Sequence, residues 1–154
     1  MFTGDRSGEW LYRALAESGF ANQPESIGRG DGLVLKNAWV TSPVRCAPPD
    51  NKPATIERDN CVEWFDAELR LLEKARVFIC LGQYGYQSLW RHLAGTGRAM
   101  PRPRPKFGHG IEVAVDDRTT LLLSFHPSQQ NTFTGKLTKE MFAEVFERAR
   151  VLSD

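Results

Sequence analysis

The feature that most constrains the fold is a short, continuous apolar run, Val77 to Leu81, that ends at Gly82. A run of this length without alternation is typical of a strand buried on both faces of a parallel sheet. Helices are predicted on either side of it, from Ile56 to about Lys74 and from Tyr84 to Leu93. Strands that alternate with helices indicate a layered α/β domain with a mainly parallel sheet.

Further elements are expected on both sides of this unit. The patterns predict a helix from about Gly8 to Ser18, one strand or a bent pair within Leu33 to Cys46, strands at Ile111 to Val115 and Thr120 to Phe125, and a last helix capped by Thr138. The stretch from Gly95 to Lys106, rich in proline, glycine and basic residues, is typical of a loop. At 154 residues, the chain is expected to form one domain over residues 1–154.

The overall charge does not point to a particular partner. A formal net charge of +1 supplies no long-range attraction for nucleic acid, so any DNA contact must come from local clusters. One such cluster is Arg98, Arg102, Arg104 and Lys106, for which an ordinary solvated loop and a phosphate contact are equally good interpretations. No stretch approaches the roughly 18 apolar residues of a membrane span. No signal peptide is visible, so a cytoplasmic location without membrane contact is expected.

The segment after the last predicted strand, His126 to Thr138, has no acidic residue and is dense in hydrogen-bonding side chains. A histidine at a strand exit, stiffened by Pro127, is well placed for an acid or electrophilic role. The alternative is a polar surface loop with a structural histidine. Ligands of α/β sheets gather beyond the carboxyl ends of the strands. We therefore expect the loops after Val44, Leu81 and Phe125 to meet there.

Asp5 lies between two glycines just before the first predicted helix. Such a carboxylate is either a helix cap or a group that positions a water molecule.

The three cysteines are too few for a disulfide framework in a cytosolic chain, which leaves metal or core roles open. Cys80 lies inside the apolar run, so a core role is expected for it. Cys46 and Cys61 are separated by a proline-rich stretch and a helix start, and two cysteines alone do not specify a metal site. Cys61 can also be plain core, since it belongs to the predicted apolar face of its helix, which comprises Cys61, Trp64, Phe65, Leu69 and Leu72.

Together, four segments resemble the uracil-DNA glycosylase superfamily, and most closely its iron–sulfur family-five enzymes. They run in order over essentially the whole chain: Phe2-Thr3-Gly4-Asp5-Arg6-Ser7-Gly8, Val44-Arg45-Cys46-Ala47-Pro48-Pro49-Asp50-Asn51-Lys52-Pro53, Cys61, and His126-Pro127-Ser128 with Asn131-Thr132 and Thr134-Gly135. The resemblance implies a three-layer α/β/α sandwich. It also implies hydrolysis of the N-glycosidic bond of uracil, or of other deaminated bases, in double-stranded DNA by a monomer.

The resemblance also assigns roles to residues. Asp5 would activate the water, His126 would stabilise negative charge on the departing base, and Asn51 would lie near the active site. The loop after His126 would press into the duplex through Ser128, Gln129, Gln130 and Asn131. Cys46 and Cys61 match the second pair of ligands of a 4Fe–4S cluster.

The family also carries, before the position of Asp5, a strand, a loop that wraps the base and a first Cys-x-x-Cys pair. We expect this chain to lack that first strand and pocket loop, to hold only two of the four cluster ligands, and to have weak or no glycosylase activity alone. Two other functions remain open: a non-catalytic DNA-binding remnant of a glycosylase, and an α/β binder of small molecules unrelated to DNA.

Overall fold

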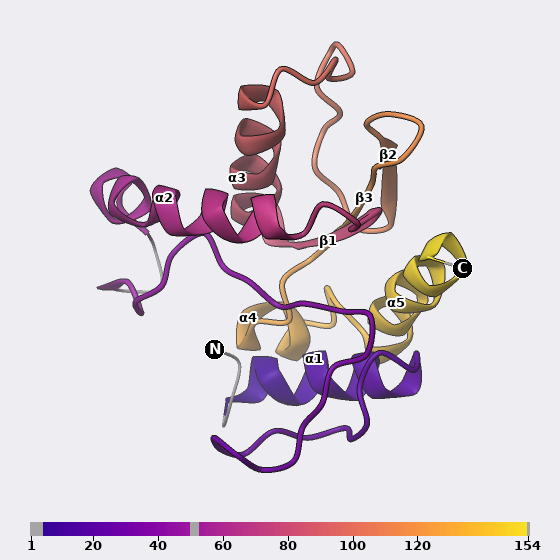
Figure 1. Cartoon of the computed structure of the whole chain (residues 1–154). Coiled ribbons are helices and arrows are strands. Elements are labelled where there is room, and N and C mark those ends of the chain that lie inside the picture. The colour runs from indigo at the N-terminus through magenta and orange to yellow at the C-terminus, as the bar shows by residue number, and fades with distance from the viewer. Residues whose placement is uncertain (1–4, 50–52, 154) are drawn as a thin grey trace.

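The computed structural model describes residues 5–49 and 53–153 (Figure 1). Its helices and strands, in chain order, are α1 (Arg6–Glu17), α2 (Thr55–Leu71), β1 (Val77–Leu81), α3 (Gly82–Gly95), β2 (Ile111–Ala114), β3 (Thr120–Ser124), α4 (Gln129–Phe133) and α5 (Lys139–Ser153). The strands and helices expected from residue 55 onward are therefore present. The short helix α4, inside the predicted polar loop, is an addition.

The three described strands form one small mixed sheet in the order β1-β3-β2. β1 and β3 run parallel, with Val77 opposite Thr120 and Leu81 opposite Ser124. β2 joins the other side of β3 as an antiparallel hairpin partner. The parallel pair brings the carboxyl ends of β1 and β3 to the same edge of the sheet.

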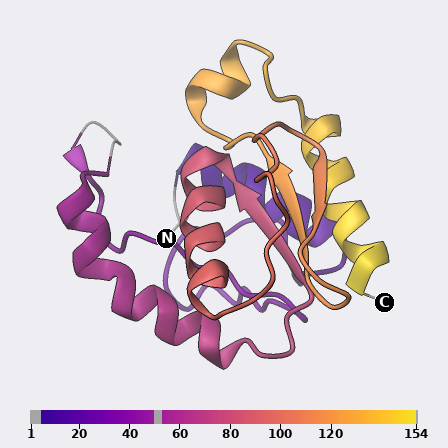
Figure 2. The same cartoon turned by 90° about the horizontal axis from the view of Figure 1, so that it is seen from above.

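Helices cover both faces of this sheet, as Figures 1 and 2 show. Alternate side chains of β3 serve the two faces: Leu122 packs with α1 and α5, whereas Leu121 and Leu123 pack with α2 and α3. Buried apolar side chains on both faces confirm the three-layer α/β/α arrangement.

The expected strand or bent pair between Leu33 and Cys46 is wrong. The described part of this segment forms a single antiparallel bridge, Ala21 with Leu35, and is otherwise irregular. Leu33, Leu35, Ala38 and Val40 still pack against the core of α1 and α5. The apolar residues of this segment therefore contribute to the core without forming a strand. A left-handed Asn37 (φ 51°) interrupts the extended course.

Trp64 was expected on the buried face of its helix, and this is also wrong. Cys61, Phe65 and Leu69 are buried, but Trp64 is 68% exposed. Residues one position apart on a helix differ in direction by about 100°. Phe65 faces α3, so its neighbour Trp64 points away from the core.

No helix in the described part of the chain is both long and apolar enough to span a bilayer.

Candidate active site

The candidate site lies at the edge where β1 and β3 end. His126 follows β3 by two residues, and Gly82 follows β1 directly. The two residues lie close together: a Cβ added to Gly82 would come within 3.3 Å of the Cβ of His126. Gly82 also has a positive φ of 85°, which favours glycine. The loops after Leu81 and Phe125 are thus brought together, as expected for the carboxyl edge of an α/β sheet.

His126 is half-buried, and burial is the main cause that lowers its pKa below the ordinary 6.5. The negative charge of Asp5 acts in the opposite direction and raises the pKa of the imidazole. This interaction means that the Asp5 carboxylate and the His126 ring lie near each other, although 120 residues separate them. Burial outweighs the charge, so the ring is neutral around neutral pH.

Asp5 is the N-cap of α1. Its Oδ1 accepts a hydrogen bond of 2.6 Å from the backbone N–H of Gly8, and its backbone is extended (φ −120°, ψ 164°). The helix-cap interpretation is therefore confirmed. Capping uses one carboxylate oxygen and holds the group at the positive end of a helix dipole. The second oxygen leaves a water-positioning role open, so the two interpretations of Asp5 are compatible.

The loop after His126 is held by its two ends. Pro127 and Leu137 are almost fully buried. Between them, the Ser128 hydroxyl caps α4 by accepting from the N–H of Asn131, and the Asn131 Nδ2 donates to the His126 carbonyl at 2.9 Å. Ser128 and Asn131 were expected to contact DNA; in the structure their side chains hold the loop together and fix the backbone of His126.

Gln129 and Gln130 form the first turn of α4 and are exposed. Phe133, at the end of this helix, is 65% exposed. The guanidinium of Arg6 lies 4.2 Å from the centre of the Phe133 ring, which fixes α4 beside the start of α1 (Figure 1). Asp5 precedes Arg6, so the same contact helps to keep the carboxylate near the His126 loop.

His109, in the loop before β2, supports the backbone next to His126. Its Nδ1 accepts from the backbone N–H of Phe125 at 3.2 Å, and its Nε2 donates to the carbonyl of Met141 at 3.1 Å. Its ring also stacks on Phe125, with the ring centres 5.3 Å apart. His109 therefore ties the residue before His126 to the first turn of α5.

The cysteine segment lies along α2. Glu68 of α2 pairs with Arg45 at 2.8 Å and also bonds the Thr41 hydroxyl, which holds the chain before Cys46 against this helix. Cys46 is exposed, Cys61 is buried within α2, and both are free thiols. Cys80 is buried in β1, where burial raises its pKa to about 12, in keeping with the expected core role. Asn51 lies outside the described residues, as do Thr3 and Gly4 of the first motif.

No three or more His, Cys, Asp or Glu side chains in residues 5–49 and 53–153 gather closely enough to hold a metal ion.

Three contributors to the site were missed from the sequence: Gly82, His109 and the Arg6–Phe133 pair. Gly82 could have been found, since a glycine directly after a buried strand is a common point of close backbone approach. The hydrogen bonds of His109 join residues that are 16 and 32 positions away, and no sequence spacing signals them.

Comparison with known proteins now adds to this geometry. Residues 1–150 match the family model described as the uracil DNA glycosylase superfamily. Similar curated proteins include the "Type-5 uracil-DNA glycosylase" of Mycobacterium bovis and that of Mycobacterium tuberculosis, each 45% identical over 154 residues. The protein of the same name from Mycobacterium leprae is 44% identical over 154 residues.

These similarities cover 99% of this chain but only 56% of the Mycobacterium bovis and Mycobacterium tuberculosis proteins and 66% of the Mycobacterium leprae protein. The chain thus spans little more than half the length of the first two relatives. The family model matches nearly every residue, on a fold that brings the carboxylate of one motif beside the histidine of another. The chain therefore belongs to the uracil-DNA glycosylase superfamily.

Proposed function

We propose that this chain acts in base-excision repair, where it hydrolyses the N-glycosidic bond of uracil, or of another deaminated base, in double-stranded DNA. The observation that carries the proposal is the interaction between the Asp5 carboxylate and the half-buried His126 imidazole at the carboxyl edge of the sheet. The names of the relatives support the same reaction class.

The reaction creates two charges that these groups match. The bond between the sugar carbon and the base nitrogen breaks and its electron pair leaves with the base, so the sugar becomes positive and a base oxygen negative. Asp5 would orient the water and take up its proton while the water oxygen bonds to the sugar carbon. The base leaves as an anion that solvent protonates.

His126 would donate an N–H to the negative oxygen of the base. Its lowered pKa supports this role, because a neutral imidazole has one N–H donor and one acceptor nitrogen. The hydrogen bond from Asn131 to the His126 carbonyl would keep the ring in place while the charge develops.

The base must leave the duplex before it reaches this site, at a cost of a few kcal/mol that is least for mismatched bases. The exposed tip of α4, Gln129 and Gln130, is suited to enter the space in the duplex. Ser128 and Asn131 would contact the backbone beside it. The loop that carries this tip is anchored in the core at both ends, because Pro127 and Leu137 are buried.

The direct test is uracil release from a duplex with a U:G mismatch under single-turnover conditions. Asp5→Asn should lower the rate at least a hundredfold, because the amide cannot take up the proton of the water. Asparagine caps a helix as well as aspartate does, so α1 should stay intact.

Glu9→Gln is the matched control, since Glu9 is an exposed acid in the first turn of the same helix. It should leave the rate unchanged. Equal rates for Asp5→Asn and the wild-type chain would refute the proposed role of Asp5. Binding of the duplex without any abasic product would favour the non-catalytic DNA-binding alternative.

Cys46 and Cys61 are proposed as two of the four cysteine ligands of a 4Fe–4S cluster. The support is partial: Arg45 and Glu68 hold the segment before Cys46 against α2, which also carries Cys61. A full set wants four thiolates, and Cys80 does not fit because its side chain is buried in the apolar core between the sheet and α3. These residues thus fit half of a cluster, and no step of the proposed reaction passes through it. We also propose that the protein is cytoplasmic and monomeric.

A further inference from the structure

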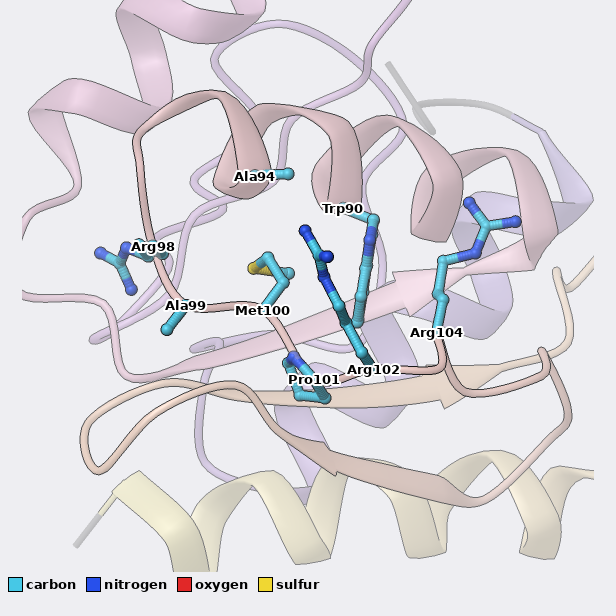
Figure 3. Close-up of a pocket in the computed structure, with 8 residues that line it drawn as sticks. All are labelled: Trp90, Ala94, Arg98, Ala99, Met100, Pro101, Arg102 and Arg104. Carbon is cyan, nitrogen blue, oxygen red and sulfur yellow. The ribbon is translucent and has the colours of Figure 1, made fainter.

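A groove of about 550 Å³ lies between α3 and the loop that follows it (Figure 3). Trp90 and Ala94 of α3 form one wall, and Met100 contributes to the apolar lining. Three arginines of the loop, Arg98, Arg102 and Arg104, also line the groove, and no acidic residue does. We call this feature the basic groove.

The loop that carries these arginines is anchored on both sides of them. Met100 packs against the core of α2 and α3. The Tyr86 hydroxyl of α3 donates to the carbonyl of Pro105 at 2.9 Å, and Phe107 packs on the Tyr86 ring with centres 6.2 Å apart. Prolines at positions 101, 103 and 105 alternate with the arginines and restrict the backbone further. Arg102 and Arg104 are thus exposed on a backbone that loses little freedom when a ligand binds.

The three arginines differ in how much of their charge is free. Arg98 donates to Asp116 at 3.0 Å and to the Thr119 hydroxyl at 2.6 Å, so its charge is largely neutralised within the fold. Neither Arg102 nor Arg104 takes part in an ion pair with any residue in the described part of the chain. Two positive charges therefore face solvent from a fixed segment.

The basic groove begins close to the candidate active site. The charge of Arg104 acts on the ring of Tyr86, where it opposes the burial that raises the pKa of that phenol. Tyr86 lies about one turn along α3 from Gly82, a distance of roughly 5–6 Å. Gly82 in turn lies close to His126. Arg104 is thus the end of the groove nearer to His126, and Figure 3 shows Arg102 and then Arg98 farther along the loop.

The geometry points to a backbone-binding surface: Arg102 and Arg104 bind phosphates of the DNA duplex outside the flipped nucleotide. This inference rests on the proposed function and adds a contact that the His126 loop does not provide. The fork of a guanidinium suits phosphate oxygens, and two neighbouring arginines without an ion pair in the described part of the chain suit a polyanion more than a single small ligand. Because phosphates carry no sequence information, the contact should add affinity to every duplex alike.

The test measures binding to two short duplexes, one with a U:G mismatch and one undamaged, by fluorescence anisotropy at a series of salt concentrations. Each phosphate contact contributes about −0.9 to the slope of log K against log salt concentration. The variant Arg102→Ala/Arg104→Ala should lose about two units of slope and bind both duplexes at least tenfold more weakly at low salt. Arg102→Lys/Arg104→Lys should keep most of the slope, since lysine also neutralises a phosphate.

Arg13→Ala is the matched control, because Arg13 is an exposed arginine of α1, which covers the face of the sheet opposite α3 and the basic groove. It should leave the slope unchanged. An equal loss for Arg13→Ala, or an unchanged slope for the double alanine variant, would overturn the inference and leave the proposed function standing. A wild-type chain without salt-dependent affinity for either duplex would instead count against the proposed function itself.

Discussion

The residues around Asp5 hold its carboxylate in place, and those around His126 lower the pKa of its ring. Asp5 is exposed and sits at the positive end of α1, where one oxygen accepts from Gly8. His126 is half-buried, and its pKa is lowered by burial although Asp5 opposes the shift. As the pH falls through 6.5, the unfolded chain takes up a proton at this histidine before the folded chain does, so His126 removes stability on acidification. The same burial keeps the ring neutral at the pH where we expect it to act.

Gly82 is the residue whose replacement should disturb His126 most directly. Gly82→Ala places a methyl group 3.3 Å from the His126 Cβ and forces alanine into a positive φ. The backbone strain should cost about 1–3 kcal/mol of unfolding free energy. The imidazole must give by a few tenths of an ångström, so uracil release should fall about tenfold, less than the roughly hundredfold loss of a misplacement of about 1 Å. Urea unfolding and single-turnover kinetics measure the two effects separately.

Gly97→Ala separates strain from displacement. Gly97 also has a positive φ, of 79°, but nothing lies within 4 Å of the added Cβ. It should lose a similar amount of stability and keep its rate of uracil release. If both variants lost activity equally, the closeness of Gly82 to His126 would not be what positions the imidazole.

At the scale of elements, the sequence predicted the helices and strands whose apolar pattern lies within one short segment. The apolar run of β1 and the apolar spacing of α2 and α5 lie within single segments, and these elements are present. The prediction of a strand within Leu33 to Cys46 was wrong because a strand needs a hydrogen-bonded partner, and pairing depends on residues far away in the sequence. Helix α4 was missed because four of its five residues are polar, so it has no apolar stripe, and it relies on the Ser128 cap.

His109 links three elements: the loop before β2, the exit of β3 and the start of α5. His109→Ala would leave the N–H of Phe125 and the carbonyl of Met141 without this partner. It should lower the free energy of unfolding by about 1–3 kcal/mol, the cost of leaving such groups unsatisfied. His109→Asn offers an acceptor near the Nδ1 position and should recover part of the loss in urea unfolding. An alanine variant as stable as the wild-type chain would show that neither hydrogen bond supports the fold.

At the scale of the whole molecule, the site joins parts of the chain that local patterns cannot relate. Composition and spacing left Asp5 as a cap or a water-positioning group and His126 as a catalytic or a structural residue. Only the resemblance between whole motifs placed them in one site. The structure adds the reason they meet: the parallel pairing of β1 with β3 sets His126 at one edge, and the Arg6–Phe133 contact brings the start of α1 to it.

The most direct test of the central claim, that Asp5 and His126 share one site, is an NMR titration of the His126 ring in the wild-type chain and in Asp5→Asn. In the wild-type chain the pKa should lie below 6.5, because burial outweighs the charge of Asp5. In Asp5→Asn it should fall further, since the carboxylate that raises it is gone while the helix cap is kept. An identical pKa of His126 in the two proteins would contradict the account.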